Sequence, residues 1–488
     1  MMKMLGVPLC LVAILAAAHL RAAENPAPNI VYVLCDDLGY GDVQALNPQR
    51  ARIPTPSMNR LAEEGMAFTD AHASCSVCTP SRYSILTGRY SWRTKLQQGV
   101  LGGFGRPLLD QRCSTVAQFL RENGYDTACI GKWHLGLGFG PDRYTTPIQD
   151  GPPQHGFGYF YGISASLDMA PFAWIDHDRF PEKPSVTKHF FRDGIAAPGF
   201  EAIDVLPALT EQATRYVRGE DRHRDKPFFL YLPLTAPHTP IVPTEAWRGK
   251  SGLGDYGDFV MQVDNTVGEV LQAIEAAGLG DNTLVIVTSD NGFAPAAGPK
   301  RLEEQGHYPS AHFRGYKSDI WEGGHRVPLI VRWPGVVRPG TRCGQLVGLI
   351  DLFATTAEVL GQEVPPHVAV DSFSMLPLLQ GSDSPVREAH IHHSNDGYFA
   401  VRKGDWKLEL CAGSGGWSRP REPRARAMNL PKVQLYNLAD DPGEETNVAS
   451  QHPERVQELS DCLSSAINRG RTTPGPTQPN DVEVVVYK

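Results

Sequence analysis

Cysteine is scarce in this sequence, with nine in 488 residues. So few thiols, spread over so long a chain, do not form a disulfide-based scaffold. Cys75 and Cys78 make a single C-x-x-C pair. A four-cysteine zinc site needs a second such pair, and because the sequence has none, zinc binding by this pair is not expected.

Positive charge is not in excess either. The formal net charge is -8, so no basic field covers the chain and nucleic acid is not an expected partner. An anionic substrate would have to be held by a local cluster of positive groups. With 41% hydrophobic and 20% charged residues, the composition is that of an ordinary globular protein, long enough for two domains.

Long hydrophobic runs are also missing. No segment reaches the roughly 20 apolar residues of a membrane-spanning helix. At the N-terminus, Lys3 precedes a short apolar stretch over residues 9–18, and the small residues Ala22 and Ala23 follow it. This pattern predicts a signal peptide over residues 1–23, a secreted or periplasmic mature protein and no membrane span after cleavage. An uncleaved anchor is the alternative.

Four continuous apolar, β-branched runs are each followed by a polar cluster; they cover residues 29–35, 127–130, 228–234 and 284–288. Such runs are typical of parallel strands buried on both faces. Helical patterns lie between them, at residues 58–64, 114–124 and 259–277. The alternation predicts an α/β fold with a doubly wound, mostly parallel sheet. Because ligands bind beyond the carboxyl ends of such strands, the four polar clusters are expected to converge on one site.

The pattern of apolar residues changes near residue 370. Short alternating runs at residues 390–393, 397–402 and 405–410 predict an antiparallel sheet, and a helix is expected over 453–467. We therefore expect a catalytic domain over residues 24–370 and a smaller C-terminal α+β domain over 371–488. The sequence shows no internal repeat.

The segment from Cys78 to Arg89 predicts a helix. Thr79 can cap it, Pro80 suits its first position and Gly88 can close it. Cys78 then lies at a helix N-terminus, where free N–H groups favour an anion, and Arg82 adds a positive charge one turn on. Two alternatives stay open: a low-pKa thiol on a surface helix, or a disulfide with Cys75.

The run Cys78-Thr-Pro-Ser-Arg82, followed by Leu-Thr-Gly-Arg89, resembles the signature of the type I, formylglycine-dependent sulfatases of the alkaline phosphatase superfamily. The resemblance implies an alkaline-phosphatase-like fold, and a Cys78 that the host's formylglycine-generating machinery oxidises to formylglycine (3-oxoalanine). Further motifs resemble those of the family in the same order along the chain, at residues 36–37, 131–136, 237–238, 289–292, 314–317, 322–328 and 435–444. Residues 135–226 match none of its motifs.

Four oxygen-bearing side chains follow two of the predicted strands, and oxygen ligands suit calcium better than zinc. The resemblance implies a Ca²⁺ ion and adds the modified cysteine to its ligands, giving Asp36, Asp37, Cys78, Asp290 and Asn291. It implies that the ion holds a sulfate oxygen and the hydrated aldehyde.

The resemblance also assigns catalytic roles. Sulfate-ester cleavage needs fixed positive charge, which Arg82, Lys132 and Lys317 would supply. His238 would help bind sulfate and protonate the departing alcohol, while His134 would take a proton from the second hydroxyl of the formylglycine hydrate. That second hydroxyl lets sulfate leave and the aldehyde return, which neither cysteine nor serine permits.

The sequence thus predicts a hydrolase of sulfate monoesters, acting on an aryl sulfate or, more naturally for an exported enzyme, on a sulfated carbohydrate. One alternative is a phosphonate or phosphodiester hydrolase of the same superfamily, and another is a sulfated-glycan-binding protein whose Cys78 stays a thiol. Three further sets of residues are candidates for the site. Residues that could line the pocket are His307, His312, Asp168, His177, Asp178 and Arg179, and a sugar-binding wall could include Tyr159, Phe160, Tyr161, Trp174 and Asp176. Residues that could contact an anionic polymer are Arg419, Arg421, Arg424 and Arg426.

Overall fold

The computed structural model describes residues 27–110 and 113–486. The predicted signal peptide lies outside these residues. Within them, no helix combines the length and the apolar character that crossing a membrane requires.

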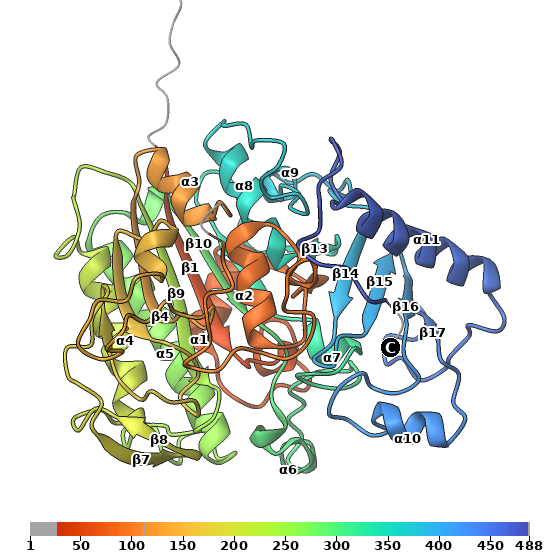
Figure 1. The fold of residues 1–488 in the computed structure, drawn as a ribbon, viewed down its shortest axis with the longest axis horizontal. Helices are drawn as coiled ribbons and strands as arrows, with labels where there is room; N and C mark the ends of the chain where they lie inside the picture. Colours follow the sequence, from red (N-terminus) through yellow and green to blue (C-terminus); the bar gives the residue numbers. More distant parts are fainter. Residues whose placement is uncertain (1–26, 111–112, 487–488) are drawn as a thin grey trace, which may run out of the picture.

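A nine-stranded sheet forms the centre of the molecule (Figure 1). Its strands are, in spatial order, β12 (Thr341–Cys343), β2 (Met66–Phe68), β11 (Leu329–Arg332), β10 (Thr283–Ser289), β1 (Asn29–Asp36), β9 (Phe228–Pro237), β4 (Asp126–Lys132), β5 (Tyr159–Ile163) and β6 (Ile175–Asp176). The five strands from β10 to β5 are all parallel, whereas β11 and β6 run antiparallel to their neighbours. The prediction of a doubly wound, mostly parallel sheet is confirmed.

Helices cover both faces of this sheet because each central strand is apolar on both sides. Val31 and Val33 of β1 pack in one core with residues of α1 (Pro56–Glu63), α4 (Val205–Val217) and α5 (Asp255–Ala276). Ile30 and Tyr32 point into the other core, with α2 (Cys78–Thr87), α3 (Val116–Glu122) and α8 (Leu352–Val359). The predicted strands and helices all form, with ends shifted by a few residues.

A separate four-stranded antiparallel sheet lies beside the central one, at the right of Figure 1. It consists of β14 (Ala389–His393), β15 (Phe399–Lys403), β16 (Trp406–Glu409) and β17 (Gln434–Asn437), and α11 (Pro453–Arg469) packs on it. This arrangement confirms the predicted antiparallel C-terminal sheet. The smaller elements are β3 (Ala71–His72) paired with β13 (Val347–Gly348), β7 (Val186–Phe190) paired with β8 (Arg192–Ala196), and the short helices α6 (Pro299–Glu304), α7 (Glu322–His325), α9 (Leu376–Leu379) and α10 (Glu422–Ala427).

The predicted domain boundary at residue 371 carries a buried ion pair. Asp371 accepts hydrogen bonds from Arg93 at 2.8 Å, from the Tyr90 amide at 3.0 Å and from the Thr472 amide at 3.0 Å. Arg93 and Asp371 are both fully buried. One carboxylate therefore joins the segment after α2 to the C-terminal tail, and the boundary itself stays a prediction.

Replacing Asp371 with alanine is expected to lower the free energy of unfolding by about 3–5 kcal/mol, because the Arg93 guanidinium is left buried without its partner. Denaturant unfolding of the purified variant measures this loss. The exposed Asp383→Ala is a matched control expected within about 0.5 kcal/mol of the parent protein. An Asp371→Ala variant as stable as that control would contradict the structural role given to the ion pair.

Candidate active site

Two adjacent strands bring four oxygen-bearing side chains together. Asp36 ends β1 and Asp37 follows it, while Asp290 and Asn291 follow β10. Asp290 Oδ1 accepts from the Asp37 amide at 3.3 Å, and Asn291 Nδ2 donates to Asp37 Oδ1 at 2.7 Å. Asp37 has a left-handed backbone with φ of 66°, a costly conformation that clusters at functional sites. The predicted convergence of these strand ends is confirmed.

Helix α2 begins at Cys78, so the predicted helix is correct but its cap is not. The residue before it, Val77, is extended and occupies the N-cap position, which leaves Thr79 inside the first turn. The Thr79 hydroxyl instead accepts a hydrogen bond from the Leu101 amide at 3.2 Å. Gly88 closes the helix with a φ of 63°, as predicted.

Cys78 is buried at the start of this helix. Its side chain is 2% exposed, and Sγ lies 3.6 Å from Asp36 Oδ1. Burial raises the pKa of the Cys78 thiol above its ordinary value, although the charges of Lys132 and Lys317 lower it. Cys78 and Cys75 are both free thiols. The alternatives of a low-pKa surface thiol and of a disulfide with Cys75 are therefore wrong.

Two of the three predicted cations lie behind the carboxylates. Arg82 contacts Asp290 Oδ2 at 2.7 Å and Asp36 Oδ1 at 3.4 Å. Lys132, the last residue of β4, contacts Asp36 Oδ2 at 2.7 Å. Burial opposes ionisation of Asp36, but the charges of Lys132, His238 and Arg82 hold its pKa well below the usual range. These buried pairs fix the negative charge of Asp36 in place.

Lys317 differs from the other two because it faces the cavity. Its Nζ lies 2.7 Å from Asp37 Oδ1 and 2.8 Å from Oδ2. Burial opposes its charge, yet Asp37 and other nearby groups raise the pKa of Lys317 above the ordinary value. It is therefore a fixed positive charge at the cavity wall.

The two predicted histidines have defined proton positions, because carbonyl oxygens only accept hydrogen bonds. His134 Nε2 lies 2.7 Å from the Leu101 carbonyl and must carry the proton, which leaves Nδ1 as a buried lone pair without a hydrogen-bond partner among the described residues. Burial, with Lys132 and Arg82 close by, lowers the pKa of His134 well below its ordinary value. His134 Nδ1 is therefore available to accept a proton.

His238 follows β9 and lies near Asp37 Oδ2, whereas the Asn291 amide donates to Oδ1. Its Nδ1 donates to the Thr239 carbonyl at 2.8 Å, so Nε2 is the nitrogen that lies 3.6 Å from Asp37 Oδ2. Burial and the charge of Lys317 lower the pKa of His238 to about 4. Nε2 is thus the nitrogen that can exchange a proton with a bound molecule.

The oxygen-bearing cluster suits a hard cation. Asn291 Oδ1 is buried and has no hydrogen-bond partner among the described residues, a costly state that a cation would relieve. Burial raises the pKa of both Asp37 and Asp290, so a cation between them would favour their charged forms. Ligand atoms of Asp36, Asp37, Cys78 and His238 all lie within 4.8 Å of one another. The residues present therefore fit a calcium ion.

A cavity of about 530 Å³ opens onto this cluster. It is lined by the predicted residues Asp37, Cys78, His134, His238 and Lys317, and by side chains that sequence reasoning did not assign to the site, among them Ser166, Met169, Phe191, Arg192, Tyr316, Asn395 and Trp417. Trp417 and Phe191 are 37% and 58% exposed. These additional residues come from segments outside the central sheet, Arg192 from β8 and the others from loops, where no local sequence signal marks them.

The further candidates divide between the cavity and other places. Asp168 and Arg421 line it. The other members of the three candidate sets are not among its lining residues. His307 instead forms a buried pair with Asp42 at 2.8 Å, and Tyr161 stacks on Trp174 against the core with ring centroids 4.8 Å apart.

Known proteins resemble this chain over nearly its whole length. The model of the Sulfatase family matches residues 28–362. The chain is 34% identical to an N-acetylgalactosamine-6-O-sulfatase of Bacteroides thetaiotaomicron, over 91% of this chain and 94% of that one. It is 33% identical to human arylsulfatase A, over 97% and 94%.

Solved structures agree. A sulfatase from a Bacteroides thetaiotaomicron locus for the metabolism of multiple glycosaminoglycans superimposes with a TM-score of 0.81 and 32% identity, covering 91% of this chain and 99% of that one. A phosphonate monoester hydrolase of Agrobacterium radiobacter, 20% identical with a TM-score of 0.60 over 90% and 95% of the two chains, shares the fold alone. With 34% identity to a sulfatase and a family match over most of its length, this chain belongs to the sulfatase family and hydrolyses sulfate esters.

Proposed function

We propose that this sulfatase removes sulfate from carbohydrates, using a formylglycine made from Cys78 and a calcium ion held by Asp36, Asp37, Asp290 and Asn291. The position of Cys78 carries the proposal. It lies buried at the first turn of α2, 3.6 Å from Asp36, and lines the same cavity as Lys317, His134 and His238. A thiol whose pKa is raised by burial is a weak nucleophile, so this place suits a residue that has lost its sulfur.

Formylglycine and calcium would supply two things that the unmodified side chains lack: a hydrated aldehyde as nucleophile, and a divalent charge for the sulfate oxygens. The protein's own residues would then orient the sulfate ester and neutralise its negative charge. Lys317 Nζ places a positive charge at the cavity wall, where charge develops on the sulfate as the ester bond breaks. Arg82 and Lys132 hold Asp36 ionised from behind.

The two histidines would handle protons at opposite stages. His238 lines the cavity and, once its imidazole is protonated, Nε2 is the nitrogen placed to give a proton to the departing alcohol oxygen, because Nδ1 is bonded to the Thr239 carbonyl. His134 Nδ1 has a free lone pair, since its Nε2 proton is donated to Leu101. It is therefore placed to accept a proton from a hydroxyl on residue 78.

The cavity favours a sugar over a purely apolar group. Trp417 and Phe191 offer exposed aromatic surface for a sugar ring, and Arg192 and Arg421 offer positive charge at the same opening. Asp168 is buried, and its Oδ1 has no hydrogen-bond partner among the described residues. That oxygen can accept a hydrogen bond from a sugar hydroxyl. The name of the Bacteroides relative, an N-acetylgalactosamine-6-O-sulfatase, supports a sulfated amino sugar as the first substrate to test.

The remaining parts of the proposal concern maturation. Residues 1–23 would be removed as a signal peptide, and the exported enzyme would meet sulfated polymers outside the cytoplasm. Oxidation of Cys78 requires formylglycine-generating machinery in the host. Edman sequencing of the mature N-terminus tests the cleavage, and a chain that retains Met1 would contradict it.

Calcium is expected to stabilise the protein, because an ion that binds only the folded state adds about 2.7 kcal/mol at a hundred times its dissociation constant. The melting temperature should rise on adding Ca²⁺ to chelator-treated protein, and the rise should shrink in Asn291→Ala, which lacks the unpartnered ligand oxygen. Asn265→Ala is the control that should respond like the parent, because Asn265 is a partly exposed asparagine on α5 whose side chain bonds Glu269. An unchanged calcium response in Asn291→Ala would contradict the assignment of this ligand.

Turnover of matched esters tests the reaction class. With the metal and the modified Cys78 present, kcat/KM is expected to be highest for a sulfate monoester, and higher for a 6-sulfated amino sugar than for an aryl sulfate. The same leaving group attached to phosphate, phosphonate and sulfate isolates the transferred group. Faster cleavage of the phosphonate would overturn the assignment, whatever the fold.

A further inference from the structure

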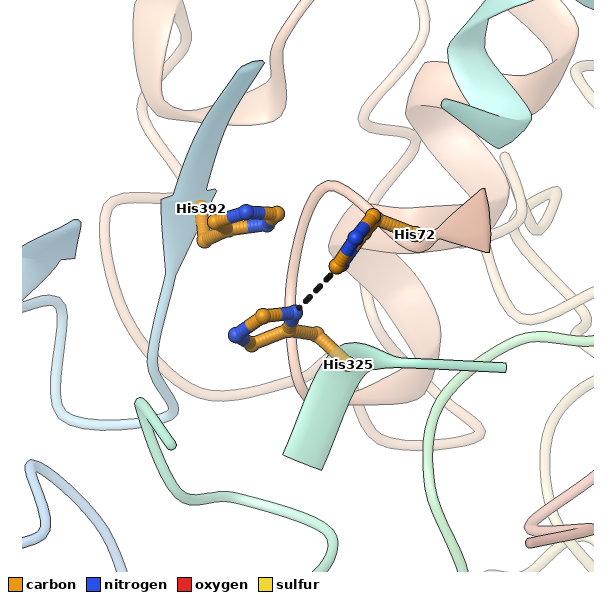
Figure 2. Close-up of side chains that lie close together, drawn as sticks. All are labelled: His72, His325 and His392. Atoms are coloured by element: carbon orange, nitrogen blue, oxygen red, sulfur yellow. Dashed lines mark hydrogen bonds between the residues drawn. The ribbon is translucent and has the colours of Figure 1, made fainter. Parts of the chain in front are cut away.

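A second cluster of buried polar side chains lies apart from the residues of the active site. His72 is in β3, His325 ends α7 and His392 is in β14. Figure 2 shows the three rings gathered where these elements meet. All three side chains are completely buried. Each residue has one ring nitrogen in the cluster, and these three nitrogens all lie within 4.8 Å of one another.

Each ring has one nitrogen next to an oxygen that only accepts hydrogen bonds. His72 Nε2 lies 2.7 Å from Asp70 Oδ1, His325 Nε2 lies 3.0 Å from the Ile320 carbonyl, and His392 Nδ1 lies 3.4 Å from the Ala73 carbonyl. When each of these nitrogens carries its proton, the three N–H groups point outward; for His325 this arrangement competes with Lys407, whose Nζ lies 3.1 Å from the same Nε2 and also donates to the Ile320 carbonyl at 2.9 Å. Proteins hold metal-binding histidines in this way, with a carboxylate or carbonyl accepting from the nitrogen that does not bind the ion.

The remaining nitrogens then face one another as lone pairs. His72 Nδ1 and His325 Nδ1 are 3.1 Å apart, a separation that repels unless a cation or a proton lies between them. His392 Nε2 is buried with no hydrogen-bond partner among the described residues. Burial lowers the pKa of all three histidines, so the rings are in the neutral form that binds metals.

We propose that His72, His325 and His392 bind one borderline transition-metal ion, of which zinc is the best match. Imidazole nitrogens suit zinc rather than calcium, and bonds of about 2.0–2.1 Å are compatible with the observed nitrogen separation. His392 stacks on His325 with ring centroids 3.8 Å apart, so binding of all three rings requires the His392 ring to turn about its Cβ–Cγ bond.

Buried ion pairs surround the three histidines. Four buried or largely buried carboxylates interact here with three cations: Asp70, Glu322, Glu409 and Glu444 with Arg326, Arg402 and Lys407. The rival to a metal is a hydrogen-bond chain in which Lys407, 3.1 Å from His325 Nε2, donates to His325 and His325 Nδ1 donates to His72. That chain leaves His392 Nε2 unsatisfied, which favours the metal.

An ion at this place would join the central part of the molecule to the C-terminal sheet. The chain runs from His72 directly to Cys78, and on the way the Ser76 amide donates to the His393 carbonyl at 3.0 Å. Fixing His72 against His392 therefore steadies the segment that leads into α2. The site is structural and independent of the proposed chemistry at Cys78.

Metal analysis of the full-length protein tests this inference. Protein produced with zinc in the medium and purified without chelators should contain about one zinc ion per chain, as measured by inductively coupled plasma mass spectrometry. His392→Gln and His72→Gln should lower that content at least about tenfold, while calcium content stays the same. His390→Gln is the control, because His390 is equally buried and also has an Nε2 without a hydrogen-bond partner among the described residues, but it is not one of the three histidines whose nitrogens lie within 4.8 Å of one another.

Cobalt substitution provides a readout that does not depend on the histidine variants folding. Co²⁺ bound to the parent protein should give visible absorption bands typical of a tetrahedral nitrogen site, and these should persist in Asn291→Ala, which alters only the active-site cluster. Three results would overturn the proposal: less than about a tenth of an equivalent of zinc after refolding with excess zinc, equal zinc in the parent and in His392→Gln, or loss of zinc in His390→Gln as large as in the ligand variants.

Discussion

Replacing Cys78 with alanine is expected to lower kcat/KM for a sulfate monoester by about four orders of magnitude or more, the usual scale for removing a covalent nucleophile. The loss should be this large because Cys78 is the residue of the cavity for which no neighbour can substitute. Its Sγ lies 3.6 Å from Asp36, in a position from which the side chain can reach both the carboxylate cluster and the cavity. Steady-state kinetics on purified protein measures the effect.

Cys75→Ala is the matched control. Cys75 is 1% exposed and only three residues earlier, but it does not line the cavity. This variant loses one buried sulfur and should keep activity within about tenfold of the parent enzyme, because the substitution lowers the free energy of unfolding rather than removing a group from the cavity. If Cys78→Ala kept comparable activity, a nucleophile at residue 78 would be ruled out and the reaction would have to use another group.

Replacing Lys317 with methionine is expected to reduce kcat/KM by about 10²–10³-fold, the range seen when one preorganised donor to a developing charge is removed. Methionine keeps most of the length and the apolar stem but loses the charge. Lys317 is the one of the three assigned cations that lines the cavity, while Arg82 and Lys132 pair with carboxylates behind it. The fall should appear mainly in kcat, because the charge that Lys317 meets grows in the transition state.

Lys300→Met controls for the loss of one positive charge, since Lys300 is 93% exposed and only weakly paired with Glu304 at 3.9 Å. It should leave kcat/KM unchanged. A melting temperature measured for Lys317→Met separates catalysis from folding, because Asp37 loses its closest cation. Full activity in a folded Lys317→Met would show that this lysine serves the carboxylate cluster rather than the substrate.

The sequence predicted the centre of the site well because parallel strands end at one edge. The apolar runs before Asp36 and Asp290 became the adjacent strands β1 and β10, and that pairing alone places their carboxylates together. Lys132 could be placed near them by the same reasoning, because it ends the parallel strand β4, two strands from β1.

What the sequence could not predict depends on contacts between distant segments. Trp417 and Asn395 come from the C-terminal part of the chain, and Arg192 from an outlying strand pair, yet all three line the cavity. Their neighbours in the sequence carry no periodic signal for such a role. The Thr79 cap failed for a related reason, because the Leu101 amide donates to its hydroxyl and an extended Val77 starts the helix. Tertiary contact overrode a sound local preference.

The chemical state of residue 78 decides whether this enzyme uses a formylglycine nucleophile. The protein is purified from its native host, or from a host with formylglycine-generating machinery, and digested. The mass of the peptide containing residue 78 is measured by mass spectrometry, and the activity of the same preparation is assayed. We expect a peptide that has lost H₂S and gained one oxygen atom relative to the cysteine form, in a proportion that tracks specific activity. Full sulfatase activity in a preparation whose residue 78 is entirely unmodified cysteine would contradict it.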